Sequence, residues 1–272
     1  MNQKTKPLTY KDEEHPLIEF DRRCKLCSLG KGKAVQGAGP NELENVKLIV
    51  ISDHPGHYEE SNGYPFHAND GETVPQRVNY GRMNGKKEVP NFPNAGKYIR
   101  DLLDELYGLD TYNEVWMTNA VKCNPRDKTI SPKHVNKCTR YHLLRELTEI
   151  NKVNPTIPIL IAGRYAFDCI KYLDKNLKNR LGTSLKKVRR TNSYRLWTHP
   201  LVFTYNPASV RDAEFRKETD IGFTELTKKD KFKVRHIHKI ERLPELPGSP
   251  RWIFRKDVKY LDDFLVSPSE FS

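Results

Sequence analysis

The chain has 272 residues and 36% hydrophobic content, enough for one large or two small domains with a buried core. Its 47 Lys and Arg against 35 Asp and Glu, a net charge of +12, favour a polyanionic partner and nucleic acid first, with a solubilising surface as the alternative. The longest apolar runs, residues 48–51 and 159–162, fall far short of the roughly 20 residues of a transmembrane helix, so no membrane span and no membrane partner are expected.

The N-terminal part, residues 1–19, is predicted to be a tail. It lacks the apolar stretch of a secretory signal, so we expect a reducing, cytoplasmic location: nucleoid-associated, or the host cytoplasm if the protein is viral. In such a compartment the five cysteines would not form a disulfide framework. Cys24 and Cys27 come next, as a C-x-x-C pair whose spacing lets two thiolates bind metal from a turn.

Apolar segments rich in β-branched residues predict four buried strands, at residues 46–52, 114–120, 157–163 and 200–205. Helical periodicity lies between them, at residues 96–108, 131–150 and 164–173. This alternation predicts an α/β fold, a three-layer α/β/α domain with a central four-stranded parallel sheet. Sites in such sheets gather at the carboxyl ends of the strands, here "SDHPG", "TNAVKC", "AGR" and "TYNPAS".

Two regions fall outside this predicted domain of residues 20–226. Residues 67–94 are rich in Gly, Pro and Asn and are predicted to be a long inserted loop. Residues 227–272 are basic, contain several prolines and carry interspersed aromatic residues, which indicates a basic C-terminal extension, an arm or a small subdomain.

Two further cysteines follow the second strand. Cys123 comes directly after it, and Cys138 lies in the second turn of a helix that begins with Ser131 as N-cap and Pro132 in the first turn. Ligands that are this far apart in the sequence are brought together by the fold. Such an arrangement suits a four-thiolate iron–sulfur cluster as well as zinc. Unrelated buried thiols are the third possibility. Cys169 has apolar neighbours and is expected in the core.

Five motifs in order resemble the uracil-DNA glycosylase superfamily, most closely its iron–sulfur branch, family 4. They are the C-x-x-C followed by a basic stretch; "SDHPGHYEESNGYPF" (52–66) for a G-E-A-P-G loop and G-x-P-F; "TNAVKC" (118–123) for T-N-x-x-K-C; "SPKHVNKC" (131–138); and "NPAS" (206–209) for H-P-[SA]. The resemblance covers roughly residues 20–215. It implies a [4Fe-4S] cluster, with zinc as the alternative, on Cys24, Cys27, Cys123 and Cys138.

The same resemblance implies roles in flipping a pyrimidine out of DNA and hydrolysing its glycosidic bond. Phe66 would stack on the flipped base, unless it is an ordinary core residue. Asn119 would read the pyrimidine edge with its amide, unless it caps a strand-to-loop turn. His54 would supply a proton or a contact, unless it is an exposed loop residue. Gly56 stands where other branches place a bulky residue that excludes C5 substituents, so thymine or a modified pyrimidine would fit.

Two positions depart from the family pattern. Asp53 occupies the place of the loop glutamate that stabilises the sugar cation or orients water, and is one methylene shorter. Asn206 replaces the histidine that donates to the leaving base, so only a neutral hydrogen bond remains available. The mismatch-specific branch also has N-P-S at this position and is active.

Basic residues predict where DNA would bind. Lys186, Lys187, Arg189 and Arg190, with Arg195, are placed in a hairpin before the last strand, where they would bind phosphates, unless this is a solvated basic face. Val210 and Arg211 correspond to the family loop that enters the minor groove.

The leading hypothesis is therefore a monomeric DNA glycosylase acting on uracil or a related pyrimidine in base excision repair. The alternative is a catalytically impaired iron–sulfur homologue that binds DNA and serves replication or repair assembly, with a partner protein on the C-terminal extension. A zinc-binding nucleic-acid module without a base pocket is the third reading.

Overall fold

The computed structural model describes residues 18, 20–29, 34–67, 95–126, 128–189, 193–208 and 250–265, with side chains from residue 253 onward in the last range. The predicted loop beyond residue 67, most of the N-terminal tail and residues 227–249 and 266–272 lie outside this part. The strands are β1 (Leu48–Ser52), β2 (Val115–Asn119), β3 (Ile159–Ala162), β4 (Arg195–Leu196) and β5 (His199–Thr204). The helices are η1 (Leu43–Asn45), α1 (His57–Asn62), α2 (Ala95–Tyr107), α3 (Pro132–Cys138), the π-helical η2 (Thr139–Leu143), α4 (Leu144–Val153), α5 (Arg164–Leu173), α6 (Lys175–Leu181), α7 (Leu185–Val188), α9 (Pro250–Val258) and η4 (Lys259–Asp263).

The strands form one sheet in the order β2-β1-β3-β5-β4. The four predicted strands are present and parallel to one another, which confirms the α/β prediction. The sheet has a fifth strand that the sequence reasoning missed, because β4 is two residues long and pairs antiparallel with the start of β5. Two residues are too few to show strand periodicity.

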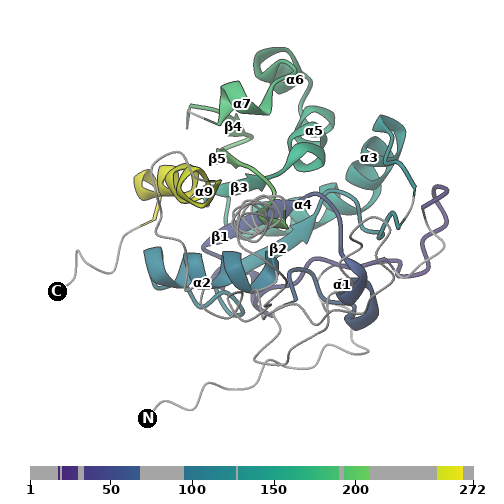
Figure 1. Cartoon of the computed structure of the whole chain (residues 1–272), viewed down its shortest axis with the longest axis horizontal. Helices are drawn as coiled ribbons and strands as arrows, with labels where there is room; N and C mark the ends of the chain where they lie inside the picture. Colours follow the sequence, from purple (N-terminus) through teal and green to yellow (C-terminus); the bar gives the residue numbers. More distant parts are fainter. Residues whose placement is uncertain are drawn as a thin grey trace, which may run out of the picture.

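Helices cover both faces of the sheet, because each parallel strand is buried on both sides. Ile49 and Ile51 of β1 belong to a core that includes residues of α3, α4, α5 and α6, whereas Leu48 and Val50 belong to a second core with residues of α2 and α9. Figure 1 shows α2 and α9 on one side of the sheet and α3 and α5 on the other. The arrangement is the expected three-layer one.

The helix predicted at residues 131–150 is the continuous run α3, η2 and α4. Ser131 is its N-cap, and its side chain accepts a hydrogen bond from the backbone N–H of His134 (3.4 Å). The helix predicted at residues 164–173 coincides with α5. Within the described ranges, no helix is both long and apolar enough to span a membrane.

Segments assigned from sequence to the two termini contribute to the cores. Ile18 is buried in the core of the α3–α6 side. Phe254, Val258 and Leu261 of α9 and η4 are fully buried against the opposite face of the sheet. The described part of the predicted C-terminal extension therefore covers the sheet beside α2.

Candidate active site

The carboxyl edge of the sheet brings together the polar residues that follow different strands. Ser52 pairs with Asn119 of β2 and with Ala162 of β3, and Ala162 pairs with Thr204 of β5. Since the strands are parallel and in this register, the residues just beyond their ends lie at one edge. Residues 53, 119 and 206, distant in sequence, therefore share one site.

Asp53 and Asn206 are in direct contact at this edge. The Asn206 amide nitrogen Nδ2 donates to Asp53 Oδ2 (2.9 Å) and to Ser52 Oγ (3.2 Å). Asp53 Oδ1 accepts hydrogen bonds from the backbone N–H groups of Tyr165 (2.7 Å) and Ala166 (3.1 Å) in the first turn of α5. An ionised carboxylate has about four acceptor sites, so these three donors leave about one site, on Oδ2, for a further ligand.

Burial raises the pKa of the Asp53 carboxyl group above its ordinary value. The N–H group of Ala166, the amide of Asn206 and the N–H group of Tyr165 act in the opposite direction because they stabilise the anion, as does nearby His54. Burial is the larger effect. A carboxylate in this setting is fixed in position and poorly hydrated, which strengthens its interaction with any cation that forms beside it.

Gly163 allows α5 to approach this carboxylate, a requirement that the sequence reasoning missed. Its φ of 123° lies in the region that L side chains rarely adopt, and a Cβ atom there would meet the Asp53 carboxylate group. The "AGR" segment at the end of a strand was the available signal. A side chain at Gly163 is incompatible with the present position of Asp53.

We expect Gly163→Ala to lower the free energy of unfolding by more than the roughly 1–3 kcal/mol of backbone strain alone, because the methyl group must also displace Asp53. Urea unfolding measures this loss. Gly182→Ala is the matched control, since Gly182 has a φ of 62° but nothing within 4 Å of an added Cβ. Equal losses in the two variants would show that Gly163 does not crowd Asp53.

Phe66 is held in an unusual backbone conformation near this edge. Its φ is 52°, a left-handed value that is uncommon for an aromatic residue, and its side chain is buried. The Glu59 carboxylate accepts hydrogen bonds from the N–H groups of both Gly56 and Phe66, which ties the ends of the loop together. Burial raises the pKa of Glu59. The conformation of this loop, and not strand or helix periodicity, therefore determines where the Phe66 side chain lies.

Arg100 of α2 fixes the same loop from the opposite side. The buried guanidinium donates from Nε to the Phe66 carbonyl oxygen (3.1 Å) and from Nη1 to the Thr111 carbonyl oxygen (2.9 Å). It also lies 4.2 Å from the centroid of the Tyr112 ring. Phe66 is therefore fixed at both its N–H and its carbonyl group.

Asn119, the last residue of β2, is buried, and its Nδ2 has no hydrogen-bond partner among the described residues. Buried amide groups are normally satisfied, so a donor of this kind at the carboxyl edge fits a group that awaits a ligand. His54 is half-buried, and its Nδ1 lies 3.2 Å from the Pro55 carbonyl oxygen. Gly56 is exposed and precedes α1 as its N-cap residue.

The four cysteines from the two motifs gather beside β2, in the core on the α3–α6 side. Cys24, Cys123 and Cys138 are buried in this core, and Cys27 packs against it. The pKa of Cys123 and that of Cys138 are each raised to about 12, mainly by burial, and charge repulsion from other cysteines of the group acts in the same direction. The four thiols therefore lie within electrostatic range of one another. Cys169 is buried in α5 and donates to the Ala166 carbonyl oxygen.

Several hydrogen bonds hold the segments that carry these cysteines. The backbone N–H of Lys122 donates to Cys138 Sγ (3.2 Å), and Lys137 Nζ donates to the Leu26 carbonyl oxygen (3.0 Å). In the part of the chain that the structure describes, no three His, Cys, Asp or Glu side chains are placed to hold a single metal ion. Four thiols are the donor set used by both a [4Fe-4S] cluster and a zinc ion, so their chemistry fits either of the two expected groups.

A fully buried ion pair that the sequence reasoning missed lies beside the cysteines. Lys122 Nζ donates to both Glu146 oxygens (2.7 and 2.8 Å) and to Thr118 Oγ1, and both charged side chains are 0% exposed. Glu146 Oε1 also accepts the N–H of Gly37 (3.0 Å). The network joins β2, α4 and the segment that follows the first cysteine pair.

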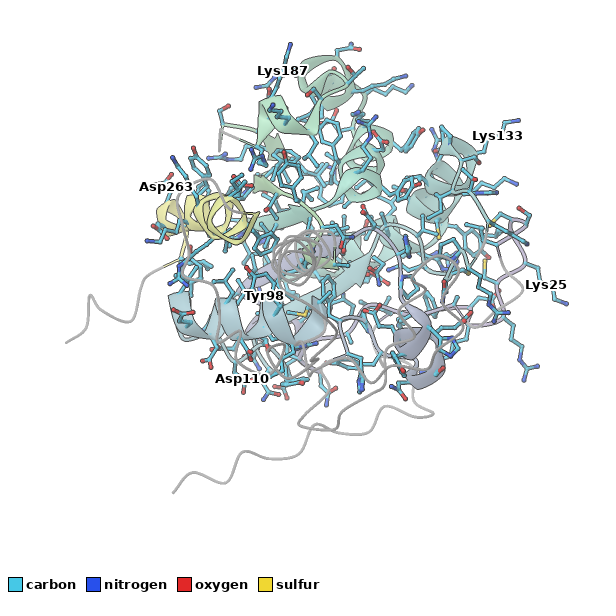
Figure 2. All side chains as sticks on the ribbon, in the orientation of Figure 1. Lys25, Tyr98, Asp110, Lys133, Lys187 and Asp263 are labelled. Atoms are coloured by element: carbon cyan, nitrogen blue, oxygen red, sulfur yellow. The ribbon has the colours of Figure 1, made fainter. Side chains whose placement is uncertain are left out.

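The predicted DNA-binding residues have different environments. Lys186 and Lys187 are exposed, but they lie on α7 and not in a hairpin, and Figure 2 shows Lys187 projecting from the outer surface. Arg189 is buried, and its Nη1 donates to Asp257 Oδ2 (2.8 Å), so it faces the interior. The hairpin predicted before the last strand is β4–β5 and contains Arg195. Three predicted residues lie outside the described part: Arg190, Val210 and Arg211.

Comparison with protein-family models gives a match. The family model described as the uracil DNA glycosylase superfamily matches residues 40–226, more than two thirds of the chain. The matched region contains Asp53, Phe66, Asn119 and Asn206 and does not contain the first cysteine pair or α9. A search of curated proteins found no match.

Proposed function

The chain belongs to the uracil DNA glycosylase superfamily, and from this premise we propose that it removes uracil or a related pyrimidine from DNA by hydrolysing the N-glycosidic bond. One observation carries the proposal: the buried Asp53 carboxylate and the Asn206 amide are in contact at the carboxyl edge. Phe66, in the loop after α1, and Asn119, the last residue of β2, belong to the same domain. A base inside a duplex is out of reach, so such an enzyme acts on a flipped nucleotide.

Breaking the glycosidic bond places positive charge on the sugar and negative charge on the leaving base. In the proposed reaction, Asp53 stabilises the sugar cation and orients the attacking water through its remaining acceptor site on Oδ2. Asn206 donates a neutral hydrogen bond to the base oxygen. Phe66 stacks on the flipped ring, and the unpartnered Nδ2 of Asn119 donates to the pyrimidine edge.

Base release from defined oligonucleotides tests this proposal. The substrates contain uracil, thymine opposite guanine, or 5-hydroxymethyluracil, in single- and double-stranded form, and abasic sites are detected by alkaline cleavage. We expect release of at least one base by the wild-type protein and none by Asp53→Ala. Equal, background-level cleavage by both proteins on every substrate would rule out the enzymatic proposal.

The range of bases is proposed to include pyrimidines with a substituent at C5. Gly56 is exposed and has no side chain, and a Cβ atom there would have a single close neighbour, the Glu59 carboxylate. A bulky residue at this place excludes a methyl group in other branches of the superfamily. The relative rates on uracil and thymine substrates measure this selectivity.

One observation favours the second candidate function, a DNA-binding protein with impaired catalysis. Both protons of the Asn206 amide are used within the protein, on Asp53 and Ser52, so donation to a base requires the amide to exchange one of these partners. DNA binding that weakens steeply with salt, without base release, would identify this function.

We also propose that exposed Lys186 and Lys187 bind phosphate groups of DNA. The roles of Arg190, Val210 and Arg211 in binding DNA remain predictions from the sequence.

We also propose that Cys24, Cys27, Cys123 and Cys138 hold a [4Fe-4S] cluster, with zinc as the alternative. The convergence of four thiols and the N–H donor to Cys138 support it, since hydrogen bonds to sulfur accompany such clusters. When bound, the group would act as a structural cross-link between the N-terminal segment, the end of β2 and α3. Binding requires deprotonated thiols, so it releases protons.

Replacing one proposed ligand is expected to remove the cluster. Cys138→Ser, purified without oxygen, should lose the broad absorption at about 400 nm and the iron and sulfide found in the wild-type protein. Cys169→Ser is the matched control, because Cys169 is also buried but is assigned to the core. A colourless wild-type protein that contains zinc would exclude the cluster, and retention of iron by Cys138→Ser would exclude Cys138 as a ligand.

A further inference from the structure

Helix α9 lies outside the region matched by the superfamily model, yet it reaches the strand that ends at the candidate site. The match ends at residue 226, and α9 begins at Pro250. Phe254 and Val258 are fully buried in the core that contains Leu160 and Val202 of the neighbouring strands β3 and β5. Figure 1 shows α9 beside β5. The helix therefore packs on the face of the sheet beside the strand that leads to Asn206.

A buried carboxylate on α9 contacts the end of β5. Asp257 Oδ2 accepts hydrogen bonds from Arg189 Nη1 (2.8 Å) and from Thr204 Oγ1 (3.3 Å). The side chains of Asp257 and Arg189 are both only 6% exposed. Because the pair is shielded from water, removing one partner would leave an uncompensated charge in the interior.

The same arginine contacts Tyr205, the residue that follows β5. The Arg189 guanidinium lies 4.3 Å from the centroid of the Tyr205 ring, and Tyr205 directly precedes Asn206. Asp257 thus contacts Thr204 directly and Tyr205 through Arg189. These two residues set the position from which the Asn206 amide reaches Asp53 Oδ2.

We infer that Asp257 is a positioning residue for Asn206 and that α9, added outside the superfamily region, is required for precise geometry at the candidate site. The catalytic part of this inference rests on the proposed function. The structural part does not, because the position of the Asn206 side chain can be followed without any reaction. Its Oδ1 accepts the backbone N–H of Ala208 (2.8 Å), so exchange of the Ala208 amide proton reports whether this side chain stays in place.

Asp257→Asn tests the inference, since the shape is kept and the charge is removed. We expect the Ala208 amide proton to exchange at least about 10-fold faster, and kcat for base release to fall about 10-fold with KM for DNA unchanged, because loss of precise positioning affects the chemical step. Glu105→Gln is the control. It removes the Arg255–Glu105 ion pair, which joins α9 to α2 and not to β5.

A double variant, Arg189→Met with Asp257→Leu, replaces the ion pair by apolar side chains and keeps the inference testable if Asp257→Asn fails to fold. It is expected to show the same faster exchange. Unchanged exchange at Ala208 in a folded variant, or equal acceleration in Glu105→Gln, overturns the inference. If the wild-type protein releases no base but exchange at Ala208 responds only to the Asp257 variants, the proposed function fails and the positioning role stands.

Discussion

Asp53→Asn is expected to lower the rate of base release by about 10²–10³-fold while leaving the fold intact. The asparagine carbonyl oxygen can still accept the N–H groups of Tyr165 and Ala166, which hold Asp53 Oδ1 in the wild-type protein. The negative charge that would face the sugar cation is lost, and so is the acceptor that Asn206 contacts. Single-turnover rates on the best substrate measure the effect.

Asp168→Asn is the matched control, because Asp168 lies on the same helix, α5, and pairs with Arg164 and Lys171 of that helix. It should keep the wild-type rate within about 2-fold. If Asp53→Asn also keeps that rate, the charge at position 53 has no part in the reaction, and the carboxylate serves only to cap α5.

The pH dependence gives a second measure of the same carboxylate. Since burial raises the pKa of Asp53, base release by the wild-type protein should decline with falling pH at a higher pH than an ordinary aspartate would cause. A raised pKa also means that the protonated form is favoured by folding: this stabilisation is present below the unfolded-state pKa and is lost as the pH rises through the folded-state pKa. The residual rate of Asp53→Asn should therefore lack this acidic decline, because an asparagine side chain does not titrate.

Glu146→Leu is expected to lower the free energy of unfolding by about 3–5 kcal/mol, the largest stability change that we predict. The substitution leaves the Lys122 ammonium group buried without its counter-ion, and it also removes the acceptor of the Gly37 N–H. The desolvation cost of the ammonium group then has no compensating attraction. Urea unfolding of wild type and variant, in the same metal-loading state, measures the difference.

Two further variants show whether the buried charge is the cause. Lys122→Met combined with Glu146→Leu removes both charges and should recover a large part of the loss, because an apolar pair of similar volume fits the interior. Lys152→Ala breaks the exposed Lys152–Glu149 pair and should cost less than about 1 kcal/mol. A loss below about 1 kcal/mol for Glu146→Leu would show that water reaches Lys122.

Local sequence patterns were sufficient for the layers of the fold and for several candidate residues. The four parallel strands are continuous apolar runs because both of their faces are covered, and α5 matches its predicted bounds because its apolar positions recur at helical spacing. Asp53, Asn119 and Asn206 could be predicted as site candidates from the same patterns, because each comes at or just after the end of a recognisable strand. The short strand β4 and the position of α9 had no such periodic signal.

The sequence by itself thus determined the α/β class, the edge of the sheet at which the candidate residues meet, and the superfamily. Only the tertiary structure decided which polar groups pair: Lys122 with Glu146, Arg189 with Asp257, and Asp53 with the first turn of α5. The physical reason is that burial and strand-end position follow from local periodicity, whereas a buried charge is stabilised by whichever opposite group the packing brings within about 3 Å, at any separation along the chain. Arg189, expected on the DNA-facing surface, is inside for this reason.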